Sequence, residues 1–358
     1  MKIAVVFGTR PEIIKLAPII RELENRKMDY FLIHTNQHYS YNMDKMFFEE
    51  LKLPEPKYNL NCGLESFRKQ VSFMTKRALE ILEKEKPNHV IVYADPTSCL
   101  AGALAAAKYN CKIHHIEAGL RSHDTTMLEE TNRIVTGRLA DYHYSPTEEA
   151  KKNLLEEGVD KKRIYMVGNT IVDSVMQNIE LANKDCNILK KLVLEKEKYF
   201  LLTFHRMENV DNKERLSKIL KSLGLVYDKY KIPIVYPMHP RTKKRIEEFR
   251  LEIPLEIKTI EPTSFLEFLQ LEANAKVVIT DSGGIQEETC ILKVPCVTLR
   301  DNTERPETLK VGSNILSGVE PEKVLKCVDI MYNKERIWKQ PFGDGMAAVK
   351  ILDIIQNL

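Results

Sequence analysis

Short apolar runs alternate with longer segments of helical periodicity along almost the whole chain. Stretches such as IAVVF (3–7) and KVVIT (276–280) are rich in β-branched residues and have the length of a buried strand. In EIIKLAPIIRELENR (12–26), apolar residues instead recur every three or four positions, as on one face of a helix. This alternation predicts βα units and parallel sheets. We expect two series of strands: 3–7, 30–35, 89–94, 112–118, 142–146 and 163–168, then 199–205, 232–239, 256–261, 276–280, 295–299 and 314–318.

The two series indicate two domains. A charged stretch (183–198) lies between them, and a chain of 358 residues is too long for one ordinary α/β core. We predict an α/β fold of two doubly wound domains, residues 1–169 and 170–342, with a cleft between them. A final helix within 343–358 is expected to pack back on the first domain. In open parallel sheets, ligands bind at the carboxyl ends of the strands, so candidate site residues are sought there.

Composition restricts the classes of partner. The 54 basic and 51 acidic residues leave a net charge of +3, too balanced for a nucleic-acid or membrane-surface protein. The seven cysteines are scattered without zinc spacing, so we expect no metal. No apolar stretch approaches the ~20 residues of a membrane span, and the N-terminal apolar run is too short for a signal peptide. We therefore expect a cytoplasmic protein with no nucleic-acid or membrane partner.

The sharpest local pattern is TDSGGIQEETC (280–290), where a buried-looking strand runs into Ser282, Gly283 and Gly284 before a helix. The glycines let a ligand approach the backbone, and free N–H groups of the first helical turn bind phosphate or pyrophosphate. A tight turn with Ser282 as helix N-cap would have the same pattern. Glu288 could hydrogen-bond ribose hydroxyls, or simply face the positive end of the helix dipole.

A similar pattern occurs near the N-terminus. GTRPEIIK (8–15) has the residues of a turn that starts a helix, and Arg10 and Lys15 bring positive charge to that helix. Taken alone, Lys15 fits a solvated helix residue better. Arg305 lies in the polar segment DNTERPE (301–307), where a surface role is the alternative to anion binding.

Carboxylates form a second group of candidates: Asp95, Glu117, Glu129 and Glu130. Several carboxyl groups in one cleft can divide acid and base duties if their environments separate their pKa values. Glu129 and Glu130 precede an expected helix, so helix-start acids are a plain explanation for at least one of them. His205 could donate a proton, bind phosphate or orient another group, although an isolated histidine more often does none of these.

Together, these motifs resemble the non-hydrolysing UDP-N-acetylglucosamine 2-epimerases. The resemblance covers nearly the whole chain, in the order GTRPEIIKLAP, LAGALAA, HIEAGLRS, EETNR, SPTEEAKKNLLEEG, VGNTIVD, HRMEN, TDSGGIQEE and RDNTERPE. It implies the GT-B architecture of two Rossmann-like domains, a UDP-sugar substrate and a homodimer. It also implies epimerisation at carbon 2 without a cofactor, by anti elimination of UDP to a 2-acetamidoglucal and syn re-addition.

The resemblance implies a role for each matching residue. The implied catalytic residues are Asp95, Glu117, Glu129 and His205. The implied substrate- and UDP-binding residues are Arg10, Lys15, Arg133, His239, Phe268, Ser282, Gly283, Gly284, Glu288 and Arg305. Among these, the Ser-Gly-Gly turn matches the pyrophosphate contact, and Glu288 matches the ribose-binding acid.

Two departures from the family pattern bear on function. The usual GDT reads ADP (94–96), which keeps Asp95 in an altered loop. The segment that binds a second, activating UDP-sugar in many bacterial members reads QHYSYNMDK (37–45), with Lys45 in place of a glutamine. We therefore expect weak or absent activation by substrate.

Four alternatives remain. The first two are a 2-epimerase for a modified UDP-N-acetylhexosamine (uronic or 3-acetamido) and a hydrolysing 2-epimerase. The others are a glycosyltransferase, for which no acceptor site is evident, and a non-catalytic UDP-sugar sensor. Retention of the three carboxylates argues against a sensor, because nucleotide binding alone does not require buried acids.

Overall fold

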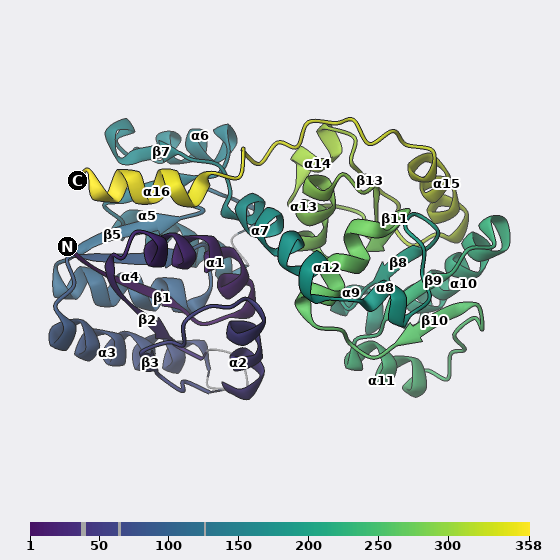
Figure 1. The fold of residues 1–358 in the computed structure, drawn as a ribbon, viewed down its shortest axis with the longest axis horizontal. Coiled ribbons are helices and arrows are strands. Elements are labelled where there is room, and N and C mark those ends of the chain that lie inside the picture. The colour runs from purple at the N-terminus through teal and green to yellow at the C-terminus, as the bar shows by residue number, and fades with distance from the viewer. Residues whose placement is uncertain (37–40, 64–65, 125–126) are drawn as a thin grey trace. The chain divides into compact units, whose positions relative to one another are not determined.

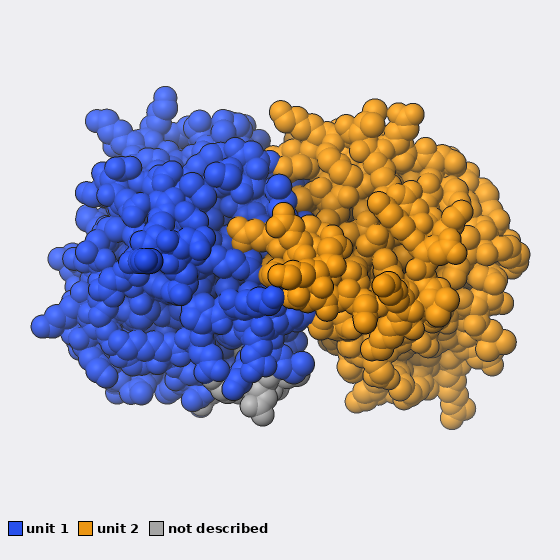
Figure 2. All heavy atoms as spheres, viewed as in Figure 1, with its two compact units in different colours: residues 1–176, 342–358 blue, residues 177–341 orange. Residues whose placement is uncertain are grey.

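The computed structural model describes residues 1–36, 41–63, 66–124 and 127–358. It divides into two compact units, here called unit 1 (residues 1–176 and 342–358) and unit 2 (residues 177–341), which Figure 2 shows in blue and orange. The part of QHYSYNMDK at 37–40 lies outside the described residues. None of the helices in the described part of the chain is long and apolar enough to cross a membrane.

Unit 1 is built on a parallel sheet of order β3-β2-β1-β4-β5-β6-β7 (Figure 1). Its strands are β1 (Lys2–Phe7), β2 (Asp29–His34), β3 (Tyr58–Asn59), β4 (His89–Tyr93), β5 (Lys112–Ile116), β6 (Tyr142–Ser145) and β7 (Ile164–Met166). Its helices are α1 (Arg10–Asn25), α2 (Tyr41–Glu50), α3 (Phe67–Glu85), α4 (Thr97–Tyr109), α5 (Leu128–Leu139), α6 (Glu148–Glu156), the 3₁₀ turn Lys161–Arg163, the start of α7 (Thr170–Asp185), and α16 (Ala347–Gln356).

Unit 2 repeats the same winding with the parallel order β10-β9-β8-β11-β12-β13. Its strands are β8 (Phe200–Thr203), β9 (Ile234–Pro237), β10 (Ile257–Ile260), β11 (Val277–Thr280), β12 (Cys296–Thr298) and β13 (Asn314–Leu316). Its helices are α8 (Ile188–Lys191), α9 (Met207–Val210), α10 (Lys213–Tyr230), α11 (Pro240–Glu248), α12 (Phe265–Asn274), α13 (Gly283–Leu292), α14 (Pro306–Lys310) and α15 (Pro321–Tyr332).

In both sheets the chain winds outward in one direction and then returns to the centre to continue in the other. This doubly wound order is that of Rossmann-like domains, and it confirms the predicted fold class. All of the expected strands form, most of them one or two residues shorter than predicted. The additional strand β3 was not expected, because two residues are too few to show a period.

Small side chains bring α4 close to the unit 1 sheet. Gly102 faces β1 and β4, and a Cβ at this position would lie 3.0 Å from side-chain atoms of Val6 and Val92. Four of the eight other buried α4 positions are alanine, so the helix packs against the strands with little side chain between them. The loop that enters α4 carries Asp95, whose position is therefore set by a tightly packed helix.

Candidate active site

Polar residues gather at one edge of the unit 1 sheet. Because β1, β4 and β5 are parallel neighbours, their carboxyl ends meet at the same edge. Thr9 follows β1, Asp95 follows β4 and Glu117 follows β5. The backbone φ is +52° at Ala94 and +60° at Glu117, a region that few non-glycine residues adopt and that is enriched at functional sites.

Glu117 is buried and is held by two donors. Its Oε2 lies 2.8 Å from Lys15 Nζ and accepts a 2.8 Å hydrogen bond from the Tyr93 hydroxyl. The Tyr93 hydroxyl is also 3.1 Å from that of Thr170. Lys15 is thus not a solvated helix residue, because it forms an ion pair with one of the expected catalytic carboxylates. Tyr93 was not expected in the site, since a tyrosine that ends an apolar strand has no distinguishing local signal.

Arg133 of α5 connects two further carboxylates. Its guanidinium group pairs with Asp95 and lies 2.8 Å from Glu130 Oε2. Burial raises the pKa of Asp95, the positive charge of Arg133 opposes this, and the negative charge of Glu117 raises the pKa further. Asp95 and Glu117 are therefore close enough to influence each other, and a carboxyl group with a raised pKa is a candidate for proton transfer.

Glu129 and Glu130 lie in the first turn of α5, and not before the helix as predicted. Glu130 is buried and accepts hydrogen bonds of 3.0 and 3.1 Å from the backbone N–H groups of Ser122 and His123. Burial alone would raise its pKa, but these hydrogen bonds and Arg133 lower it below the ordinary value. Glu130 therefore anchors the preceding loop as a carboxylate, whereas Glu129 is exposed.

Asp95 and Glu129 line the same pocket, which has a volume of about 380 Å³. The other residues that line it are Thr9, Pro11, Phe67, Gln70, Pro96, Thr97, Leu128 and Asn132. Arg10 lies between two of these residues in the chain, and its guanidinium group is 5.5 Å from the centroid of the Phe47 ring. The pocket therefore combines two of the expected catalytic carboxylates with the turn that follows β1.

A buried carboxyl group, Glu12, organises that turn. Its Oε2 accepts hydrogen bonds of 2.9 Å from Gly8 N, Thr9 N and the Thr9 hydroxyl, and the Ser98 hydroxyl also donates to it at 2.9 Å. Burial raises the pKa of Glu12 to about 7, although these hydrogen bonds act in the opposite direction. Sequence reasoning missed Glu12, yet Thr-x-x-Glu at a helix start is the signal of a capping box and could have found it.

In unit 2, the fully buried Asp281 joins the end of β11 to the loop after β8. It accepts hydrogen bonds from the backbone N–H groups of His205 (3.2 Å) and Arg206 (2.9 Å) and from the Asn209 amide (3.1 Å). These contacts hold His205 beside the start of α13. Asp281 belongs to the segment TDSGGIQEETC, but nothing in that local pattern shows that it is an anchor for this loop.

The structure brings the two expected histidines of unit 2 together. The rings of His205 and His239 stack with their centroids 5.5 Å apart. His239 is the N-cap residue of α11, where its ring accepts a 3.1 Å hydrogen bond from Arg241 N. Burial lowers the pKa of His239, and the nearby His205 and Arg241 lower it further. His205 is exposed, so it is available to a ligand.

The helix predicted to follow the Ser-Gly-Gly motif is α13, but it begins at Gly283, so both glycines lie in its first turn and not before it. Gly283 and Gly284 are the first residues of this ten-residue helix, and Ser282 is at the N-cap position. Within the described chain, the Ser282 side chain makes no capping hydrogen bond. A Cβ at Gly283 would lie 2.6 Å from Glu304 Oε1, so a larger residue at this position would have to displace the Glu304 carboxylate.

Glu304 places a carboxylate against the start of α13. It is held by Arg206 Nη2 at 2.9 Å and by Arg300 Nη1 at 2.7 Å. Burial would raise its pKa, but Arg300 and Arg206 lower it to about 2. The first turn of α13 therefore already faces a negative group, as expected of a helix start that binds anions. Sequence reasoning missed Glu304 and Arg206, because their pairing joins segments about a hundred residues apart.

The remaining expected residues of unit 2 lie on or near α13. Glu288 is buried on this helix, and Phe268 of α12 packs in the same apolar cluster as Ile285. Arg305 Nε lies 2.8 Å from Oε1 of the buried Glu287, so Arg305 is not the surface residue that its polar loop suggested as an alternative. The expected residues thus form one group in unit 1 and another in unit 2.

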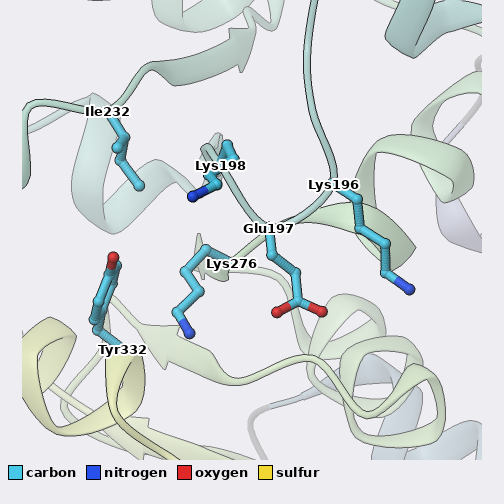
Figure 3. Close-up of a pocket in the computed structure, with 6 residues that line it drawn as sticks. All are labelled: Lys196, Glu197, Lys198, Ile232, Lys276 and Tyr332. Carbon is cyan, nitrogen blue, oxygen red and sulfur yellow. The ribbon is translucent and has the colours of Figure 1, made fainter.

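A different pocket, of about 570 Å³, lies at the amino ends of β8, β9 and β11, away from the Ser-Gly-Gly turn. Figure 3 shows its lining residues, Lys196, Glu197, Lys198, Ile232, Lys276 and Tyr332. Because ligands of doubly wound sheets bind at the carboxyl ends of the strands, this pocket is not a candidate for the nucleotide that the resemblance implies. Among the described residues, no group of three or more His, Cys, Asp or Glu side chains is arranged to hold a metal ion.

Known proteins resemble the chain over its full length. A family model described as UDP-N-acetylglucosamine 2-epimerase matches residues 21–356. A UDP-N-acetylglucosamine 2-epimerase of Methanocaldococcus jannaschii is 53% identical, over 99% of each chain. The crystal structure of M. jannaschii UDP-GlcNAc 2-epimerase in complex with UDP-GlcNAc and UDP matches with a TM-score of 0.89 and 52% identity, over 100% of each chain. A UDP-2,3-diacetamido-2,3-dideoxy-D-glucuronate 2-epimerase of Pseudomonas aeruginosa is 36% identical, over 100% of each chain.

Proposed function

Because the chain belongs to the UDP-N-acetylglucosamine 2-epimerase family of isomerases, we propose that it interconverts UDP-N-acetylglucosamine and UDP-N-acetylmannosamine without releasing free sugar. The observation that carries the proposal is the gathering of Asp95, Glu117 and Glu129 at one edge of the unit 1 sheet. A nucleotide-binding protein without catalysis would not require this group of carboxylates, two of which are largely removed from water.

Unit 2 supplies the groups for the nucleotide. The backbone N–H groups of Ser282, Gly283 and Gly284 are proposed to bind the diphosphate at the start of α13. Glu288 is proposed to accept hydrogen bonds from the ribose, and Phe268 belongs to the segment proposed to meet uracil. His205, His239 and Arg305 are further candidates for contacts to the diphosphate.

Unit 1 supplies the groups for the hexose. Carbon 2 of an N-acetylhexosamine is not next to a carbonyl group, so its proton is difficult to remove directly. Departure of UDP makes carbon 1 electron-poor and acidifies that proton, and its removal gives a 2-acetamidoglucal. Return of UDP and delivery of a proton to the opposite face then give the epimer. This route needs carboxyl groups in different protonation states, and the raised pKa of Asp95 supports such a division.

The proposal is tested by proton NMR of the chain with UDP-N-acetylglucosamine in heavy water. We expect UDP-N-acetylmannosamine with deuterium at carbon 2 and no free N-acetylmannosamine. Glu129→Gln should slow deuterium incorporation by about 100-fold or more, the usual contribution of a positioned acid or base. Glu149→Gln is the matched control, because Glu149 is an exposed acid in the first turn of α6, as Glu129 is in α5.

The same spectra separate the alternatives. Free N-acetylmannosamine together with UDP would identify a hydrolysing 2-epimerase. The relative that is 36% identical keeps a modified sugar open, so UDP-2,3-diacetamido-2,3-dideoxy-D-glucuronate is the second substrate to test. Epimerisation of this uronate alone would reject the plain N-acetylhexosamine as substrate.

A further inference from the structure

Glu272 of α12 is a carboxyl group buried completely inside unit 2. Its side chain has no exposed surface, and neither carboxyl oxygen accepts a hydrogen bond from a donor in the described part of the chain. An ionised carboxylate in such a place is strongly unfavourable, because nothing replaces the water that it has lost. A protonated carboxyl group avoids this penalty and has a hydrogen to donate.

The packing of α12 on α13 directs Glu272 toward Glu288. Phe268 and Glu272 are four residues apart on α12, and Ile285 and Glu288 are three apart on α13, so each pair lies on one face of its helix. Phe268 and Ile285 pack against the same apolar cluster, and the two helices are in contact. The faces that α12 and α13 turn toward this cluster therefore also carry the two carboxyl groups.

The groups around Glu272 favour a proton held between Glu272 and Glu288. Burial raises the pKa of Glu272 well above its ordinary value, and the carboxyl group of Glu288 raises it further. The other titratable groups beside it are Cys296 and Tyr199, whose pKa values are raised chiefly by burial and partly by Glu272 itself. Both are neutral at pH 7, so Glu288 is the acceptor to which the Glu272 proton can be donated.

We propose that Glu272 is a positioning residue for the ribose of the nucleotide. As a neutral acid it donates a hydrogen bond to one carboxylate oxygen of Glu288, which leaves the other oxygen oriented toward the ribose hydroxyls. This inference rests on the proposed function, in which Glu288 binds the ribose. Glu272 thus favours a nucleotide that carries ribose hydroxyls, without touching the nucleotide itself.

The test compares the binding of UDP and 2′,3′-dideoxy-UDP to variants of Glu272 by isothermal titration calorimetry. Glu272→Leu removes the donor, and its Kd for UDP should rise about tenfold while that for the dideoxy nucleotide changes by less than about threefold. Glu272→Gln keeps an N–H donor and should retain the preference for UDP. In turnover, Glu272→Leu should raise KM with little change in kcat.

Gln270→Leu is the matched control, because Gln270 is a buried polar residue of the same helix that donates to Ala182 O instead. It should keep the preference for UDP even if it lowers stability. If Glu272→Leu loses affinity for both nucleotides equally, or for neither, the inference is overturned. A parent chain that binds no UDP would overturn the proposed function as well.

Infrared spectroscopy decides the matter if Glu272→Leu does not fold. The parent chain should show a protonated-carboxyl band that is absent in Glu272→Gln and that shifts with UDP but not with 2′,3′-dideoxy-UDP. Absence of the band, or an equal shift with both nucleotides, would overturn the inference.

Discussion

Glu12 makes the stability of unit 1 depend on pH. Its side chain is 1% exposed, and burial raises its pKa from 4.5 to about 7 in the folded chain. Replacing Glu12 by glutamine removes this titration but keeps one oxygen that can accept from the N–H groups of Gly8 and Thr9. The amide N–H of glutamine can donate to the Ser98 hydroxyl, which in the parent chain donates to Glu12. We therefore expect Glu12→Gln to change the pH dependence of stability more than the fold.

The magnitude follows from the two pKa values. Between pH 4.5 and about 7 the folded chain holds the Glu12 proton and the unfolded chain releases it, so the free energy of unfolding falls as the pH rises. The total loss is 2.303RT multiplied by the difference between the two pKa values, about 3 kcal/mol. Below pH 4.5 both states are protonated, and well above pH 7 both are ionised, so the contribution is constant outside this range.

Urea unfolding followed by far-ultraviolet circular dichroism measures the effect. The free energy of unfolding of Glu12→Gln minus that of the parent chain should increase by about 3 kcal/mol from pH 5 to pH 8.5. The variant must be compared with the parent chain because other buried groups also titrate. Burial lowers the pKa values of His34 and His143 to about 4 and about 3, so these residues make the free energy of unfolding fall as the pH falls, opposite to the effect of Glu12. Glu24→Gln, on the exposed face of the same helix, is the control.

A flat difference between Glu12→Gln and the parent chain, within about 1 kcal/mol over this range, would refute the reasoning. It would mean that the hydrogen bonds at the turn after β1 compensate the desolvation of the carboxylate.

Four further predictions concern the candidate site. Gly283→Ala should raise the Kd for UDP by about tenfold in calorimetry, because its Cβ would collide with Glu304; an unchanged Kd would contradict this. Asp281→Ala leaves buried donors without an acceptor, so it should lower the free energy of unfolding by about 3 kcal/mol. Asp281→Asn should lower it by less, and the tryptophan fluorescence of unit 2 measures both. Arg133→Met removes the cation that opposes the raised pKa of Asp95, so the acidic limb of the kcat/KM profile should move to higher pH; an unmoved limb would exclude Asp95 as its source. Initial rates should depend hyperbolically on UDP-N-acetylglucosamine, and a sigmoidal curve would show that substrate activation survives.

Local patterns predicted the fold well because they report local physics. The apolar run before Ser282 is long enough to indicate a strand, and the two glycines after it indicate a turn and a helix start. The capping box of Thr9 and Glu12 is equally local and was readable from the sequence. What it did not reveal is that Glu12 is buried, because burial depends on α4, which contributes Ser98.

The partners of charged residues could not be predicted in this way. Lys15 pairs with Glu117, about a hundred residues later in the chain, and no periodicity links the two. Glu129 and Glu130 are adjacent acids in one helical turn, and only the fold decides which of them is buried against the 122–123 backbone. Residue identity therefore indicated the chemistry of the site, whereas tertiary contacts decide which carboxylates are available.

The return of the chain to unit 1 has a consequence for its biogenesis. Residues 342–358 complete unit 1, and the apolar face of α16 packs against α1, but roughly 165 residues of unit 2 are synthesised in between. At about 5–20 residues per second, the nascent first unit waits about 10 to 30 seconds on the ribosome for its last helix. During that interval the apolar surface of α1 that α16 will cover is exposed to solvent and to chaperones.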